Sequence, residues 1–222
     1  MTMNYLQLVN AVLRRLREGE VTTVQGSDNS NSYARLIGDF VNEAKAAVEN
    51  AWHWDRLSSE IQVNTVSGTA SYVVPGTTHK FNVSKVINQA SKTVLSERPL
   101  QWIDDQQLLS TVANAEPFFY AYDGVDSATG SVKLRLFPTP NAVYQMQVFG
   151  DLKKTDLSAD TDTMLVPDRP VILLATAMAI EERGENGGQS SIYAFQVAQT
   201  ALADEIALDA SKTPHLTTWY AA

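Results

Sequence analysis

The side chains that could do acid–base or metal chemistry are few in this sequence. The three histidines are His53, His79 and His215, and none has another His, Asp or Glu at the spacing of a metal site. Asp55 lies two residues from His53, so on a helix their side chains would point in different directions. We therefore expect exposed or interfacial imidazoles, with no metal and no cofactor.

Two pairs of adjacent carboxylates, Asp104–Asp105 and Glu181–Glu182, are the remaining candidates for catalysis. Adjacent carboxylates diverge on a helix, so solvent-exposed helix charges are the favoured interpretation. The alternative is a glycan hydrolase using these Asp and Glu pairs, which would need two acids flanking a groove. Ser190 and Ser191 are not part of a G-x-S-x-G elbow, and no common phosphate-binding loop occurs. We therefore predict no catalytic residue and a protein that is not an enzyme.

Aromatic residues offer a different kind of site. Trp52 and Trp54 could stack on a sugar or a base, but packing at the end of a helix is the favoured interpretation. Residues 213–222 follow a helix stop at Pro214 and are too short to fold alone. Large apolar groups on such a segment are often interface anchors. The predicted partner-binding residues are His215, Leu216, Trp219 and Tyr220.

Composition limits the class of protein. The chain has 222 residues, 44% of them hydrophobic, and no cysteine, which suits one domain with an elaboration in a reducing compartment. Its start lacks a signal-peptide pattern, and its longest strongly apolar stretch, residues 171–180, is too short to span a bilayer. We expect a soluble protein without a membrane partner.

The net charge of −8 is uneven, because residues 151–222 have eleven acidic and five basic residues. This balance argues against binding of a phosphate backbone, which needs clustered Lys and Arg. It is compatible with a surface that DNA passes without specific binding, or with an acidic face that only aids solubility.

The hydrophobic pattern predicts an α+β fold. Apolar residues at helical spacing predict helices over 3–18 and 32–57 and two more within 169–210. Asp168 is expected to cap the third helix, and Gly184–Gly188 to separate it from the fourth. The last helix should carry Ile192, Phe195, Ala198, Leu202, Ile206 and Asp209 on its sides. Residues 61–65 and 72–76 read as a hairpin, and a short helix is expected over 101–113. A polar connection covers 150–168, and further strands are expected at 81–88, 92–98, 117–123, 132–137 and 142–149.

Several phrases of the sequence occur in this order: LQLVNAVLRRLREGEV, AWHWDRL, EIQVNTVSGTASYVVP, EPFFYAYDG, LRLFPTP, YQMQVFG and LSADTDTMLVPD. Together with the order of elements, they resemble the head-to-tail adaptor (connector) proteins of tailed phages, of the tail tubular protein A-like family of short-tailed phages. The resemblance covers residues 4 to about 210. It rests on loose patterns of aromatic, proline and aspartate positions rather than on an invariant site.

This resemblance implies a helical bundle, made of an N-terminal and a C-terminal helix pair, with an inserted antiparallel β-rich domain and an extended C-terminal tail. The corresponding predicted domains are 1–57 with 151–212, 58–150, and 213–222. It implies a structural virion protein of the neck, assembled in the host cytoplasm. Twelve copies would form a ring between the portal protein and the tail nozzle or tube, and DNA would pass through it during ejection. A tail-completion protein of another ring symmetry is a further alternative.

Overall fold

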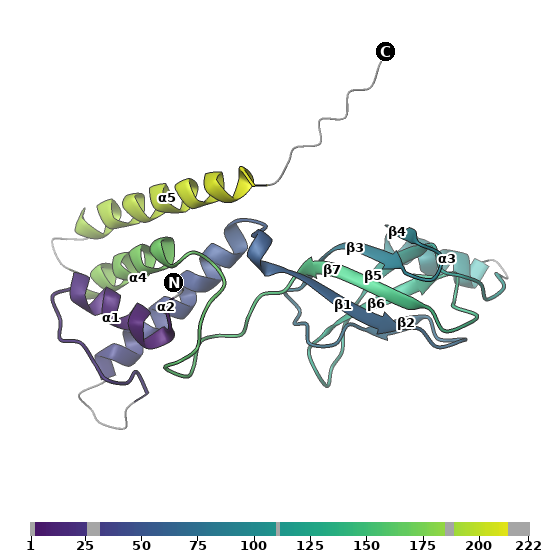
Figure 1. Cartoon of the computed structure of the whole chain (residues 1–222), viewed down its shortest axis with the longest axis horizontal. Helices are drawn as coiled ribbons and strands as arrows, with labels where there is room; N and C mark the ends of the chain where they lie inside the picture. The colour runs from purple at the N-terminus through teal and green to yellow at the C-terminus, as the bar shows by residue number, and fades with distance from the viewer. Residues whose placement is uncertain (1–2, 26–31, 110–111, 185–188, 213–222) are drawn as a thin grey trace, which may run out of the picture. The chain divides into compact units, whose positions relative to one another are not determined.

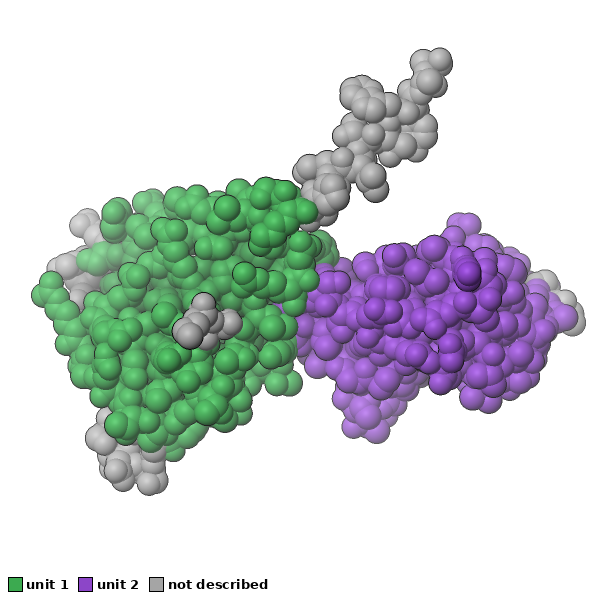
Figure 2. Space-filling view, in the orientation of Figure 1, with its two compact units in different colours: residues 1–56, 154–222 green, residues 57–153 purple. Residues whose placement is uncertain are grey.

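The computed structural model describes residues 3–25, 32–109, 112–184 and 189–212. This part of the chain contains five α-helices and a seven-stranded sheet, which confirms the predicted α+β class. The chain divides into two compact units (Figure 2). Residues 1–56 with 154–222 form unit 1, and residues 57–153 form unit 2.

The helices described in unit 1 surround α4. This helix contacts α1, α2 and α5, and α5 lies along it (Figure 1). The small side chains of Ala175, Ala177 and Ala179 are buried on α4 and let its neighbours approach closely. The bounds are α1 Tyr5–Arg15, α2 Ser32–Ala51, α4 Asp168–Arg183 and α5 Gln189–Ala210.

Local sequence explains where these helices begin. Asn4 and Gln7 form a capping box at α1, in which each side-chain oxygen accepts the other residue's backbone N–H, at 2.9 and 3.0 Å. The prediction that Asp168 caps the third long helix is wrong. Pro167 occupies the cap position, and Asp168 is the first residue of α4. The Asp168 carboxylate is used elsewhere: it accepts the Met3 N–H at 3.1 Å.

The second helix is shorter than predicted. α2 ends at Ala51 rather than at Leu57, and residues Asp55–Leu57 form a separate 3₁₀ turn. Trp54 explains the early end, because its buried indole N–H donates to the Val48 carbonyl oxygen at 2.8 Å. This side chain folds back on the helix and turns the chain toward the first strand.

The break between the last two helices is confirmed. α4 ends at Gly184, whose φ of 63° lies in the left-handed region that favours glycine. The rest of the predicted break, residues 185–188, lies outside the described residues. On α5, Ile192 is 60% exposed, whereas Ala198, Ala201 and Asp209 are buried. α5 has one main neighbour, so only a narrow stripe of small residues is covered.

The segment predicted as a polar connection is part of the core of unit 1. Leu157, Met164 and Val166 are buried. Asn42 of α2 holds Leu157 with a pair of hydrogen bonds, since its Oδ1 accepts the Leu157 N–H at 2.8 Å and its amide donates to the Leu157 carbonyl oxygen at 3.0 Å. The chain that returns from unit 2 is therefore fixed on α2.

A buried lysine makes a second contact with the same segment. Lys45 Nζ donates to the carbonyl oxygens of Lys154 and Thr155 at 2.9 and 3.2 Å. It also lies 3.1 Å from Glu49 Oε1, and both charged side chains are buried. Burying an ammonium group is costly unless it is paired, so these contacts together make the position tolerable.

Unit 2 is built on one curled sheet. Its neighbour order is β1–β7–β3–β4–β5–β6–β2, and side chains from both end strands join the same core, so the sheet is nearly closed. The bounds are β1 Ser58–Asn64, β2 Ser71–Val73, β3 Asn82–Asn88, β4 Thr93–Glu97, β5 Phe119–Val125, β6 Val132–Phe137 and β7 Gln145–Asp151. The buried core residues include Phe81, Val86, Leu95, Tyr120, Leu134, Leu136, Met146 and Val148.

The predicted hairpin does not form. β1 pairs with β7, and β2 pairs with β6, both antiparallel. The residues between β1 and β2 are held by Tyr72, whose hydroxyl accepts the Val66 N–H at 3.0 Å and lies 2.6 Å from the Thr69 carbonyl oxygen. Alternation predicted both strands, but their partners lie far along the chain and leave no local signal.

The expected short helix over 101–113 is α3, Leu100–Leu109, and residues 110–111 lie outside the described part of the chain. It connects β4 to β5, which form the one parallel pair of the described sheet. A parallel pair needs such a crossover, because its strands run in the same direction. The wholly antiparallel arrangement that was expected is therefore wrong at this point.

The close packing of β7 against β3 can be tested at Gly150. A Cβ at this position would lie against the Asn82 carbonyl oxygen and 2.7 Å from Phe81 Cζ. We expect Gly150→Ala to lower the free energy of unfolding by about 1–3 kcal/mol, as measured by urea denaturation. Gly19→Ala is the control, because a Cβ there meets nothing within 4 Å. Equal stability of the two variants would contradict this packing.

Candidate functional site

The described histidines do not form a site. His53 and His79 are exposed and belong to different units, and His215 lies outside the described residues. In the parts of the chain that the structure describes, no group of three or more His, Asp or Glu side chains is placed to hold a metal ion.

The two carboxylates of α3 have different environments although they are adjacent. Arg135 of β6 forms ion pairs with Asp104 and with Asp123 of β5, the latter at 2.8 Å between Nη2 and Oδ1. Asp105 is exposed. The interpretation of both as solvent-exposed charges is thus right for Asp105 and wrong for Asp104. The Asp104 contact holds α3 on the sheet.

Arg98 and an aromatic cluster extend this attachment of α3. The Trp102 ring meets the rings of Phe119 and Phe137 edge-on, with centroids 5.2 and 5.6 Å apart. The Arg98 guanidinium stacks 5.5 Å from the Trp102 ring and 5.2 Å from the Phe119 ring. Sequence reasoning missed both arginines. The available signal was Arg135 at a polar position of an alternating strand, facing away from the core.

The adjacent carboxylates at the end of α4 are exposed. Glu181 and Glu182 lie in the last turn of that helix. Next to them, Arg183 forms an ion pair with Glu18 at 2.7 Å and donates to the Tyr33 hydroxyl at 2.8 Å. The charged groups here connect the end of α4 to the elements that precede it in unit 1.

The two tryptophans near the end of α2 do not form a stacking platform. Trp54 is buried and hydrogen-bonded to α2, whereas Trp52 is 40% exposed. Packing at the helix end, the favoured interpretation, is correct for Trp54. Trp52 is one of several large apolar side chains that the structure leaves at the surface.

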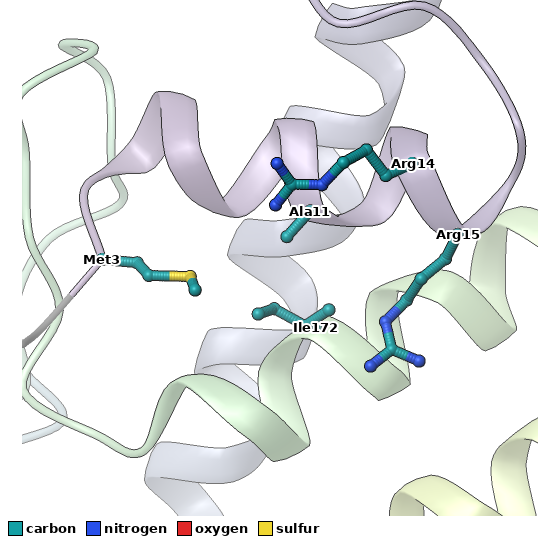
Figure 3. A pocket seen from close by; sticks show the side chains of 5 residues that line it. All are labelled: Met3, Ala11, Arg14, Arg15 and Ile172. Carbon is teal, nitrogen blue, oxygen red and sulfur yellow. The ribbon is translucent and has the colours of Figure 1, made fainter.

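Unit 1 has an open hollow of about 380 Å³ between α1 and α4. Met3, Ala11 and Ile172 line it with apolar groups, and Arg14 and Arg15 stand at its rim (Figure 3). The two guanidinium groups point in different directions, Arg14 over Ala11 and Arg15 toward α4. Arg14 is also paired with Glu20 at 2.9 Å. The arginines therefore do not converge on a common anion.

Unit 2 has a second hollow, of about 420 Å³, on the outer face of β1, β7, β3 and β4. Ile87, Val94 and Phe149 give it an apolar floor, and Lys85 lies over the Phe149 ring at 4.7 Å. Polar side chains complete the lining: Glu60, Gln89, Lys92 and Gln147. These lining residues include one acid and no histidine, so the composition resembles a protein-binding surface more than a catalytic cleft.

Exposed apolar residues gather on two helices. On α5, Ile192, Tyr193 and Leu208 are 60%, 70% and 59% exposed. On α3, Leu108 and Leu109 are more exposed still, near the end of the helix. Exposed apolar side chains that are neighbours, as Ile192 and Tyr193 are and as Leu108 and Leu109 are, mark candidate sites of interaction. The predicted partner-binding residues His215, Leu216, Trp219 and Tyr220 lie outside the described residues.

None of the described helices is long and apolar enough to cross a bilayer. Comparison with known families gives a match to the family described as SU10 adaptor protein, over residues 3–218. The search among curated proteins finds no match.

The two carboxylates of α3 can be separated by experiment. Asp104→Asn should lower the free energy of unfolding by about 0.5–1 kcal/mol, because it removes a partly exposed ion pair with Arg135. Asp105→Asn should leave stability unchanged. We expect neither variant, nor the unaltered protein, to cleave peptidoglycan in a turbidity assay. Glycan cleavage that Asp104→Asn or Asp105→Asn abolishes would establish the hydrolase alternative instead.

Proposed function

This chain belongs to the SU10 adaptor protein family, and we propose that it forms a ring that connects the portal to the tail nozzle and extends the DNA channel. Membership makes it a structural adaptor protein of a phage and implies a place in the virion neck, next to portal and tail components. The observation that carries the proposal is the extent of the match, which includes both units.

In this proposal the helices of unit 1 act as a bundle that carries unit 2 as an inserted β-rich domain. The domain division 1–57 with 151–212, and 58–150, describes these two parts. Two features support it: α4 contacts helices from both ends of the sequence, and the return segment is fixed on α2 by Asn42 and Lys45.

The contacts between copies would use apolar surface that one chain leaves uncovered. α5 presents Ile192, Tyr193 and Leu208 away from α4, its main neighbour. A helix with apolar residues around its whole circumference is usually buried on more than one side. A second copy of the chain supplies such cover in a ring, for which we propose twelve copies.

The segment 213–222 would add a docking contact through His215, Leu216, Trp219 and Tyr220, on the portal or on a neighbouring copy. Its aromatic residues have the composition of interface anchors. Assembly would take place in the host cytoplasm, and the finished ring would carry DNA during ejection.

The ring is tested by electron microscopy of the purified protein, alone and mixed with portal. We expect rings of twelve copies on the portal. The double variant Ile192→Glu with Leu208→Glu should remove the rings, because it places charges in the proposed contact, and should leave the circular dichroism spectrum unchanged. Val143→Glu is the matched control, since that valine of unit 2 is also strongly exposed. Rings of another symmetry would indicate the tail-completion alternative, and intact rings in the α5 variant would exclude α5 as the contact.

DNA should pass the protein without being bound. The acidic residues of the last third of the chain repel phosphate groups, and four of the nine arginines, Arg14, Arg98, Arg135 and Arg183, are engaged with carboxylates or aromatic rings. We expect no mobility shift of duplex DNA at physiological salt. Binding that weakens steeply with salt would contradict this, because such a slope reports contacts of Lys and Arg with phosphates.

A further inference from the structure

One edge of the sheet in unit 2 has no second strand on it. β1, Ser58–Asn64, is the first strand in the neighbour order, and β7 is the only described strand that pairs with it. Seven residues make β1 as long as β3, β5 and β7, which lie inside the sheet. The other end strand, β2, has three residues. The edge of β1 is therefore the longer of the two edges of this sheet that have no second strand.

The register shows which backbone groups face this edge. Thr65 donates its N–H to the Tyr144 carbonyl oxygen, and Leu152 donates to that of Leu57, both at 2.8–2.9 Å. In an antiparallel pair the bonding residues alternate, so the odd-numbered residues of β1 bond to β7. The N–H and C=O groups of the even-numbered residues point to the free edge: Ser58, Glu60, Gln62 and Asn64.

Apart from the single charge of Glu60, this edge lacks the usual protections against pairing. Sheet edges are commonly blocked by proline, lysine, a bulge or a very short strand. β1 contains neither proline nor lysine, and its register with β7 is continuous over all seven pairs. Its inward side chains Ile61 and Val63 are only partly buried, although they pack against the core. An added strand would cover both.

The chain itself contains a segment suited to this edge. Residues 216–220 read Leu-Thr-Thr-Trp-Tyr, a run of β-branched, aromatic and aliphatic residues with high strand propensity. Five residues of strand span about 17 Å, which fits within the seven residues of β1. Alternation would place Leu216, Thr218 and Tyr220 on one face, in line with Ile61 and Val63.

We propose that residues 215–220 of this chain pair with the free edge of β1 as an added strand. Backbone hydrogen bonds to the even-numbered residues supply the contact, and the alternate apolar side chains extend the core of unit 2. The proposal deepens the proposed tail contact by naming its acceptor, and it does not depend on the ring.

Residue-resolved amide hydrogen exchange of the full-length protein tests this pairing. We compare two double variants. One carries both Thr217→Pro and Thr218→Pro, and the matched control carries both Thr217→Ala and Thr218→Ala. Proline removes backbone donors from two consecutive positions, one of which must face β1. The amides of Glu60 and Gln62 should exchange about fivefold or more faster in the proline variant, and those of Ile61 and Val63 should be unchanged.

A second pair of variants tests the acceptor strand. Gln62→Pro deletes one donor at the free edge without touching the bonds to β7, and Gln62→Ala retains it. The binding partner is the full-length chain that carries Thr217→Pro and Thr218→Pro, and the probe is a labelled peptide of residues 213–222. The affinity for this peptide should be about fivefold weaker with the additional change Gln62→Pro than with Gln62→Ala.

The source of the strand is an outcome of the same measurements. Protection that falls on dilution assigns the strand to a second copy, and protection independent of concentration in a monomer assigns it to the same chain. Equal exchange of Glu60 and Gln62 in the proline and alanine variants overturns the proposal. Rings seen by electron microscopy in that case would leave the proposed function standing.

Discussion

The attachment of the return segment to α2 is the constraint on which the rest of this protein depends. The chain leaves unit 1 after residue 56, builds a whole sheet and must come back to place α4 and α5. Lys45 and Asn42 fix the returning backbone within a few residues of its re-entry. Removing one partner of a buried ion pair lowers the free energy of unfolding far more than replacing both partners. The contacts of Lys45 with Glu49 and with the two carbonyl groups therefore stabilise the protein together. With this contact in place, α4 can occupy the centre of the helices.

The charged side chains of this protein mostly connect its own elements. Arg135 joins α3 to β5 and β6, Arg183 joins the end of α4 to Glu18 and Tyr33, and Lys45 joins α2 to the return segment. Each is engaged by carboxylates, ring faces or carbonyl oxygens. Catalysis would require such groups to converge on a substrate, whereas these groups contact other elements of the same chain. That use of charge suits a protein whose function lies in its shape and its contacts.

The sequence predicts the elements of this protein better than their partners. The strand candidates at 81–88, 92–98 and 132–137 located β3, β4 and β6 closely, and strict alternation marked the last of them because it has one face on a core. It could not show that β1 pairs with β7, since that choice depends on side chains some eighty residues away. Asp168 looked like a helix cap because caps are read locally, whereas its carboxylate accepts an N–H from Met3 at the far end of the sequence. That His53 and His79, in the described part of the chain, lie apart could be expected from their spacing, but the role of Asp104 needed the position of Arg135.

The exposed apolar residues of α5 show why the candidate surfaces could not be predicted from the sequence. Apolar residues on a helix indicate burial without saying what buries them. In the structure Ala198 and Ala201 of α5 are buried, and Ile192, Tyr193 and Leu208 remain at the surface. The same holds for β1, which pairs with another described strand along one edge only. Apolar surface and hydrogen-bonding groups that one chain leaves uncovered can be covered by a partner, so a pattern of apolar residues in an adaptor protein does not by itself distinguish a core from an interface.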